Sequence, residues 1–378
     1  MIRLSRAFLA VLLTVALSAC VSTLERPEIT ADDQAAARVN GYGAVRLWKD
    51  AELPEWTAWR EAMFAQRVQA GAPGQFEMLS ISSGSDKGAF SAGFLNGWSE
   101  AGTRPRFDIV SGVSTGALIA PFAFLGQDYD PQLRELYTTI SAKMIYRSTA
   151  LKGLLGGPSL ASTEPLVELI EGYATKEMID AVAGEHAMGR RLLVQTTNLD
   201  AERGVVWDLG AIAASENPAR YRLFRQILLA SASIPGLFPP VMIDVDSEGF
   251  AFAELHVDGG TTSSVLAIPP AVLINGKAGV EDRPGRITVL YNGALEPVYR
   301  TTKPTTFSIL TRALTTSLKT ADQRTLASLE NYAETNGLIL SIHNVGAEAE
   351  DPEAEMFDQA YMQKLFEVGR QRALNLPE

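Results

Sequence analysis

Short apolar runs alternate with amphipathic segments from about residue 75 to residue 345, and this alternation constrains the fold more than any other feature. Strands separated by helices usually pair in parallel, because the chain crosses back over the sheet before it forms the next strand. Helices then cover both faces of the sheet. The pattern predicts an α/β fold with three layers, in which helices flank a central, mostly parallel sheet. The expected strands are 76–82, 108–112, 191–199, 204–208, 250–257, 286–291 and 338–343, and the expected helices are 88–101, 115–125, 131–143, 163–174, 218–230 and 305–335.

The segments outside this alternation suggest four regions. Residues 1–19 have the layout of a secretory signal, and residues 20–74 form a tether with two expected helices, 32–46 and 54–70. The run Gly71-Ala72-Pro73-Gly74 breaks the second helix, so a catalytic domain is expected at residues 75–345. Residues 346–378 form a C-terminal helical extension, with a helix expected at 353–374.

Composition bounds the possible partners. Of the 378 residues, 46% are hydrophobic, which is enough to build a sizeable core. The formal net charge is -11, and nucleic-acid binding needs dense Lys and Arg surfaces, so no nucleic-acid partner is expected. An acidic body also gains little from an anionic lipid surface, so any membrane attachment should come from another part of the chain.

The N-terminus offers such an attachment. Residues 1–6 carry Arg3 and Arg6, and residues 7–17 form an apolar run too short to span a bilayer. The following Leu17-Ser18-Ala19-Cys20 resembles the lipobox of bacterial lipoproteins, in which the Cys is lipidated and becomes the mature N-terminus. The resemblance implies a lipid-anchored envelope protein, and Val21 favours the outer membrane, facing the periplasm. The alternative is an ordinary signal with a chance Cys. Because Cys20 is the only cysteine, an internal disulfide is excluded.

The strongest chemical motif is Gly112-Val113-Ser114-Thr115-Gly116. It follows an expected strand and opens an expected helix, which is the context that a G-x-S-x-G nucleophile requires. The glycines permit a tight turn that projects Ser114 at the helix N-terminus. There the helix dipole and the Thr115 N–H favour a developing oxyanion.

Two further motifs also lie at the ends of expected strands. Ser83-Gly84-Ser85-Asp86-Lys87-Gly88 follows the first one and lacks the spacing of a P-loop. It is either a plain strand-to-helix turn or a loop whose N–H groups stabilise an oxyanion. Val257-Asp258-Gly259-Gly260 follows a later strand. An Asp between glycines is common in turns, but these glycines also leave room for a serine to reach the Asp258 carboxylate.

These three motifs, in this order, resemble those of the patatin-like phospholipases. The resemblance extends to Thr196-Thr197-Asn198-Leu199-Asp200 and to the segment 230–240, and it covers about residues 75–345. It implies the three-layer patatin-like fold and a lipid acyl hydrolase, of the phospholipase A or lysophospholipase type. It also implies a Ser114–Asp258 dyad, a lipid or acyl-ester substrate, and neither a metal nor a cofactor.

One departure from the family pattern concerns the oxyanion loop. The family usually has three consecutive glycines where this chain has Ser83, Gly84 and Ser85. A serine still supplies an N–H group but adopts positive φ at a higher cost than glycine. The expected oxyanion donors are the N–H groups of Gly84, Ser85 and Thr115.

In the mechanism that the resemblance implies, Asp258 accepts the Ser114 proton directly. A carboxylate is a weak base in water, so Asp258 needs an apolar, partly dry site that raises its pKa. The apolar run Leu237-Phe238-Pro239-Pro240 could provide that site and an acyl groove, or could serve packing alone.

Two alternatives remain open from the sequence. The first is an α/β-hydrolase triad in the chain order Ser114, Asp258, His343; the other histidines are His186 and His256. The second is a catalytically impaired lipoprotein that binds a lipid or a partner, which the serines in the oxyanion loop would suit.

Overall fold

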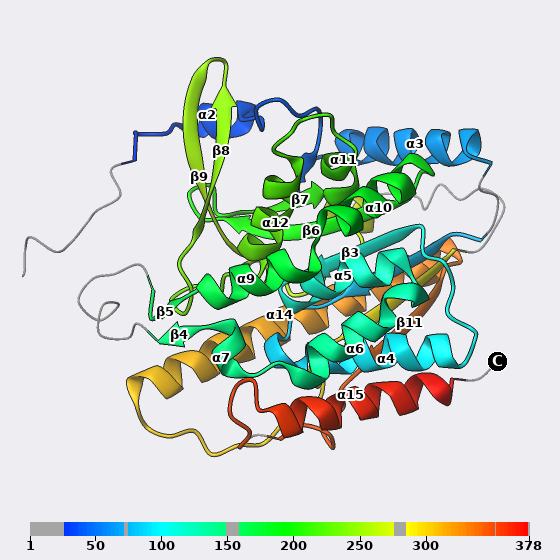
Figure 1. Ribbon diagram of the computed structural model, residues 1–378, viewed down its shortest axis with the longest axis vertical. Helices are drawn as coiled ribbons and strands as arrows, with labels where there is room; N and C mark the ends of the chain where they lie inside the picture. The colour runs from blue at the N-terminus through cyan, green and yellow to red at the C-terminus, as the bar shows by residue number, and fades with distance from the viewer. Residues whose placement is uncertain (1–25, 72–74, 149–158, 276–284, 352, 377–378) are drawn as a thin grey trace, which may run out of the picture.

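The computed structural model describes residues 26–71, 75–148, 159–275, 285–351 and 353–376 (Figure 1). Cys20 and the proposed signal peptide lie outside these residues. Within the described ranges, no helix is both long and apolar enough to cross a membrane.

The strands form one large and one small sheet. In chain order they are β1 (Arg46–Trp48), β2 (Glu77–Ile81), β3 (Ile109–Val113), β4 (Arg147–Ser148), β5 (Ala161–Ser162), β6 (Arg191–Asn198), β7 (Arg203–Asp208), β8 (Val241–Ser247), β9 (Phe250–Asp258), β10 (Arg286–Tyr291) and β11 (Ile339–Asn344). The large sheet has the order β1-β7-β6-β3-β2-β10-β11, and the β8–β9 hairpin joins it at β6. The five strands from β6 to β11 are parallel, whereas β1, β7, β8 and β9 pair antiparallel. The prediction of a mostly parallel central sheet is confirmed.

Helices cover both faces of this sheet. They are α2 (Ala31–Ala36), α3 (Leu53–Gln69), η1 (Ser85–Lys87), α4 (Gly88–Glu100), α5 (Thr115–Leu125), η2 (Gln127–Tyr129), α6 (Asp130–Thr139), α7 (Ala142–Ile145), α9 (Glu164–Tyr173), α10 (Lys176–Ala187), α11 (Leu209–Ala213), α12 (Arg220–Ser231), η3 (Gly259–Thr261), α13 (Pro270–Asn275), α14 (Thr306–Asn336) and α15 (Gln359–Leu374). C-terminal α15 runs alongside α4, as Figure 1 shows in red and cyan.

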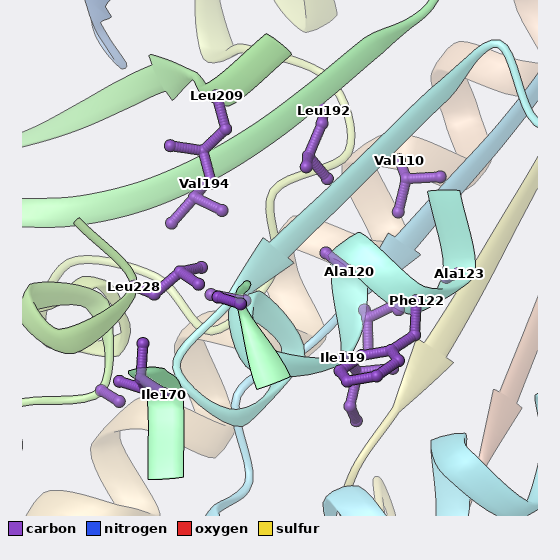
Figure 2. Close-up of a cluster of buried hydrophobic side chains, with 14 of the residues drawn as sticks. Val110, Ile119, Ala120, Phe122, Ala123, Ile170, Leu192, Val194, Leu209 and Leu228 are labelled. Carbon is purple, nitrogen blue, oxygen red and sulfur yellow. The ribbon is translucent and has the colours of Figure 1, made fainter. Parts of the chain in front are cut away.

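Alternation along the strands builds a separate hydrophobic core on each face. Leu79 and Ile81 of β2 belong to the cluster that packs against α4, α5 and α12, whereas Met78 belongs to the cluster beneath α3 and α14. Successive side chains of a strand point to opposite faces, so a fully buried strand supplies both cores. Figure 2 shows the first core, where Val110 and Leu192 of the sheet lie near Ile119 and Ala120 of α5.

Several segments differ from the sequence predictions, among them the following three. The helix expected at 32–46 ends at Ala36 as α2, because Ala37 leaves the helical conformation and Arg38 pairs with Asp246 in an isolated β-bridge. No strand is predicted for 241–247, yet β8 forms there and pairs with β9. No helix is predicted for 176–187, where α10 forms behind an N-cap at Thr175.

The C-terminal helix also begins later than expected. It starts at Gln359 rather than at residue 353, because Phe357 has a positive φ of 61° and Asp358 caps α15 by accepting the Tyr361 N–H.

Candidate active site

Ser114 occupies a strained turn between β3 and α5. Its φ of 57° and ψ of -121° are unusual for a residue with a side chain, and they suit the elbow of a G-x-S-x-G nucleophile. The flanking glycines are required by close packing. A Cβ on Gly112 would lie 2.3 Å from the Gly116 oxygen, and a Cβ on Gly116 would lie 2.2 Å from the Ile81 oxygen. The turn is therefore held against β2 with no room for side chains.

A hydrogen-bond chain fixes the backbone of this turn. The Ser114 N–H donates to Ser231 Oγ over 3.0 Å, and the Ser231 hydroxyl donates to the Gln195 oxygen over 2.7 Å. Ser231 is the last residue of α12, so it links that helix to β3 and β6. Ser231 lies within the 230–240 segment that carries the family resemblance, but its chain position alone does not reveal this contact.

Strand pairing brings Asp258 to Ser114. Strand β3 ends with Val113 opposite Gln195 of β6, and β9 continues along β6 with Asp258 opposite the next residue, Thr196. The Ser114 side chain lies close enough to the Asp258 carboxylate to lower its pKa as a hydrogen-bond donor. A Cβ on the adjacent Gly259 would lie 2.3 Å from the Gln195 oxygen, so this glycine is needed for the close approach.

The Asp258 carboxylate is buried, with the residue 5% exposed. Burial raises the pKa of Asp258 from 3.8 to about 7, although hydrogen bonds from the Ser114 side chain and from the Gly260 N–H both act to lower it. The Gly260 N–H lies 2.7 Å from Oδ1. Desolvation penalises the charged form of the carboxyl, and its effect on the pKa is larger than that of these two bonds. The site thus has the apolar surroundings that a carboxylate base needs near neutral pH.

The loop after β2 places N–H groups beside Ser114. Gly84 has a φ of 157° and Ser85 a φ of 56°, so Ser85 adopts the left-handed conformation that glycine adopts more readily. The N–H groups of Gly84, Ser85 and Thr115 have no protein acceptor among the described residues. Ser85, Ser114 and Thr115 line one pocket. Two of the three predicted oxyanion residues, Ser85 and Thr115, thus border the same pocket as Ser114, and Gly84 directly precedes Ser85 in the loop.

Asn292, just after β10, clamps this loop. Its N–H donates to Ser82 Oγ over 2.8 Å and its side-chain amide donates to the Ser82 oxygen over 2.9 Å, while its own Oδ1 accepts from Ser91. A Cβ on Gly84 would lie 2.4 Å from the Asn292 oxygen. Asn292 is not among the residues predicted from the sequence, although a polar residue at the carboxyl end of a parallel strand is a general signal for a site.

The pocket that opens from Ser114 is almost wholly apolar. Its cavity volume, the space open to a water-sized sphere, is about 50 Å³. Its aliphatic and aromatic lining comes from α5, α6, α7, α9, the segment after α12 and the start of α15, and it includes Phe238 of the predicted groove. Apolar walls of this kind suit the contact with a hydrocarbon chain.

All three histidines are described, and none lines this pocket. His343 lies in β11, which β2 and β10 separate from β3, and its ring stacks 4.6 Å from Phe94. His256 is fully buried, with its ring nitrogens 2.8 Å from Thr196 Oγ1 and 3.0 Å from Glu254 Oε2. His186 lies 3.6 Å from Asp208. The structure brings Asp258 to Ser114 and leaves the histidines elsewhere.

Metal-binding side chains do not gather in the described ranges, where no group of three His, Cys, Asp or Glu residues could hold an ion. The site consists of a serine, a carboxylate and backbone N–H groups.

Comparison with known proteins identifies the family. The family model for patatin-like phospholipases matches residues 79–271, just over half of the chain. The chain belongs to the patatin-like phospholipase family. Membership indicates a hydrolase that acts on lipid acyl esters, and the match includes both Ser114 and Asp258. No curated protein matches this patatin-like chain. Among solved structures, it is similar to VipD from Legionella pneumophila at 13% identity and a TM-score of 0.40, over 80% of this chain and 67% of VipD.

Proposed function

We propose that this protein hydrolyses acyl esters of lipids with Ser114 as the nucleophile and Asp258 as the base. The single observation that carries the proposal is the pairing of a strained, pocket-lining Ser114 with a nearby buried carboxylate whose pKa burial raises to about 7. A base with a pKa near the working pH is both substantially deprotonated and strong enough to take a serine proton.

The mechanism has two half-reactions. The Ser114 oxygen attacks the ester carbonyl while Asp258 accepts its proton. The tetrahedral oxyanion takes hydrogen bonds from the Gly84, Ser85 and Thr115 N–H groups, and the N-terminus of α5 adds a favourable dipole. Collapse breaks the bond to the leaving alcohol, which receives the proton from Asp258. Water then attacks the acyl-enzyme, again with Asp258 as the base, and releases the fatty acid and the free serine.

The hydrocarbon pocket supports a lipid rather than a small polar ester as the substrate. Leu118, Leu166, Leu169 and Ile234 line it together with Ser114. An acyl chain that enters the pocket removes apolar surface from water, which contributes roughly 0.8 kcal/mol for each buried CH₂ group. Phospholipids and lysophospholipids both present such chains next to an ester carbonyl.

We also propose that lipidated Cys20 anchors the protein in the bacterial envelope, with the catalytic body facing the periplasm from the outer membrane. The short apolar run and the lipobox-like Leu17-Ser18-Ala19-Cys20 support this. Several acyl chains hold a protein on a bilayer where one chain holds it only reversibly. The body then remains beside its lipid substrate without a basic surface of its own.

Release of fatty acid from phospholipid vesicles and hydrolysis of a p-nitrophenyl ester test the proposal. Ser114→Ala should lower turnover by about 10⁶, the cost of losing the nucleophile in a comparable serine enzyme. Ser328→Ala, at an exposed serine of α14 far along the chain, is the matched control and should retain wild-type activity.

Two outcomes would contradict the proposal. Wild-type protein that hydrolyses neither substrate but binds lipid would favour the impaired, lipid-binding alternative. The left-handed Ser85 in the oxyanion loop is the feature that suits that alternative. Equal hydrolysis by wild type and Ser114→Ala would place the nucleophile elsewhere.

A further inference from the structure

The wall of the acyl pocket includes a segment that lies outside the family match. Phe357, just before α15, and Met362, within it, line the pocket together with Ser114. The family model ends at residue 271, so these two side chains lie outside the part of the chain that it matches. They are therefore candidates for setting which substrates this particular protein accepts.

Phe357 is held in an unusual conformation. Its φ is 61°, which is uncommon for any residue with a side chain and especially for a bulky one. Such a conformation persists only where the surroundings hold it in place. The Phe357 N–H donates to Asp86 Oδ2 over 3.0 Å, and Asp86 is the residue after Ser85 of the oxyanion loop. A buried carboxylate thus ties the pocket wall to the catalytic loop.

Aromatic contacts extend this wall. The Phe357 and Tyr146 ring centroids are 6.4 Å apart, and those of Tyr146 and Phe238 are 6.2 Å apart. Phe238 follows α12 and also lines the pocket, whereas Tyr146 follows α7. Three segments far apart in the sequence thus meet in one row of rings, which favours packing against a hydrocarbon chain.

A second connection anchors the same segment to the oxyanion loop. Glu350 pairs with Lys87 at 2.5 Å and accepts the Ala294 N–H at 3.1 Å. Asp86 and Lys87 are consecutive, so the loop that carries Gly84 and Ser85 contacts the C-terminal segment at two points. The position of Phe357 and the shape of the loop are consequently linked.

We propose that Phe357 determines the acyl-chain preference of the pocket, and that Asp86 positions Phe357 through its N–H group. Phe357 is only half-buried and borders the pocket, so part of its ring is open to a chain that enters there. Chains long enough to reach its ring gain a contact that shorter chains lack. The inference rests on the proposed function for its substrate class, but chain binding can be measured without catalysis.

The activity experiment compares p-nitrophenyl esters of increasing chain length by kcat/KM. Phe357→Ala should lower the ratio of long-chain to butyryl hydrolysis by about tenfold, the lower end of what one apolar contact contributes to discrimination. Met356→Ala is the matched control, because Met356 is 46% exposed and does not line the pocket, and it should keep the wild-type ratio.

The role of Asp86 has its own pair of variants. Asp86→Ala removes the acceptor and should reproduce the loss of long-chain preference seen with Phe357→Ala. Asp86→Asn keeps an oxygen that can accept the Phe357 N–H, so it should restore most of that preference. Equal chain-length ratios in these two variants would contradict the positioning role.

The binding experiment uses a dansyl-labelled fatty acid in the Ser114→Ala background. Phe357→Ala should weaken binding about tenfold, and Met356→Ala should not. Suppose that the wild-type protein hydrolyses esters, and that Phe357→Ala either keeps the wild-type chain-length ratio or loses activity equally toward all esters. Either result would overturn the inference and leave the proposed function standing. Phe357-dependent fatty-acid binding by a protein that hydrolyses no ester would overturn the function and support the inference. Absence of both binding and hydrolysis would overturn both.

Discussion

Asp258→Asn should make the protein more stable at neutral and alkaline pH while it abolishes hydrolysis. The carboxylate has a pKa of about 7 in the folded protein against an ordinary value of 3.8, because burial penalises its charged form. The folded state therefore holds this proton more tightly than the unfolded state. As the pH rises from about 4 to about 7, ionisation of Asp258 lowers the free energy of unfolding of the wild-type protein. Above pH 7 this loss of stability is complete and remains constant.

The size of the effect follows from the shift. A difference of about 3 pKa units, at about 1.4 kcal/mol for each, makes the charged carboxylate cost on the order of 4 kcal/mol of folding free energy above pH 7. The amide of the variant carries no charge, so this pH-dependent cost disappears. Its oxygen can accept from Gly260 or Ser114, and any change in those bonds adds an offset that does not vary with pH.

Urea unfolding of wild type and Asp258→Asn at about pH 4.5 and pH 8 measures this difference. The stability of the variant relative to wild type should increase by on the order of 3 to 4 kcal/mol between the two conditions. Asp128→Asn, at an exposed side chain of η2, serves as the control and should follow the wild-type curve. Parallel curves for wild type and Asp258→Asn would refute the claim that burial raises this pKa.

Three further predictions follow from the site and the N-terminus. Ser231→Ala should lower kcat by roughly tenfold to a hundredfold, because the Ser114 N–H loses the acceptor that holds the nucleophile turn in place. An unchanged kcat would show that this hydrogen bond does not position the nucleophile. His343→Ala should keep ester hydrolysis within about tenfold of wild type, because the His343 ring packs on Phe94 and lies in a strand three positions away from β3. A loss of about a thousandfold in a folded variant would favour a catalytic triad. Cys20→Ser should abolish incorporation of a radiolabelled fatty acid in the bacterial envelope, and label retained by the variant would contradict the anchor.

Local sequence signals were sufficient for the nucleophile turn. The strand–Ser114–helix order is contiguous in the chain, and the glycines at 112 and 116 mark close packing that any structure of this turn requires. The strand alternation also predicted most elements of the central sheet, because parallel strands are buried on both faces and appear as apolar runs.

The remaining features depend on contacts between distant segments. The position of Asp258 beside Ser114 depends on β9 continuing the edge of β6 where β3 ends, which no local pattern reveals. Strand β8 did carry a readable signal, since Ile243 and Val245 alternate with polar residues before a turn at Glu248 and Gly249. Phe357 could not be assigned to the pocket from sequence, because its place depends on the Asp86 contact across more than half of the chain.

The most direct test of the account is to identify the residue that a fluorophosphonate ester modifies. Such probes form a stable adduct with an activated serine, and digestion followed by mass spectrometry locates the adduct. The account predicts modification at Ser114, no modification of Ser114→Ala, and much slower modification of Asp258→Asn, because that variant lacks the base that takes the serine proton. An adduct on another residue, or equal labelling of wild type and Ser114→Ala, would contradict the central claim.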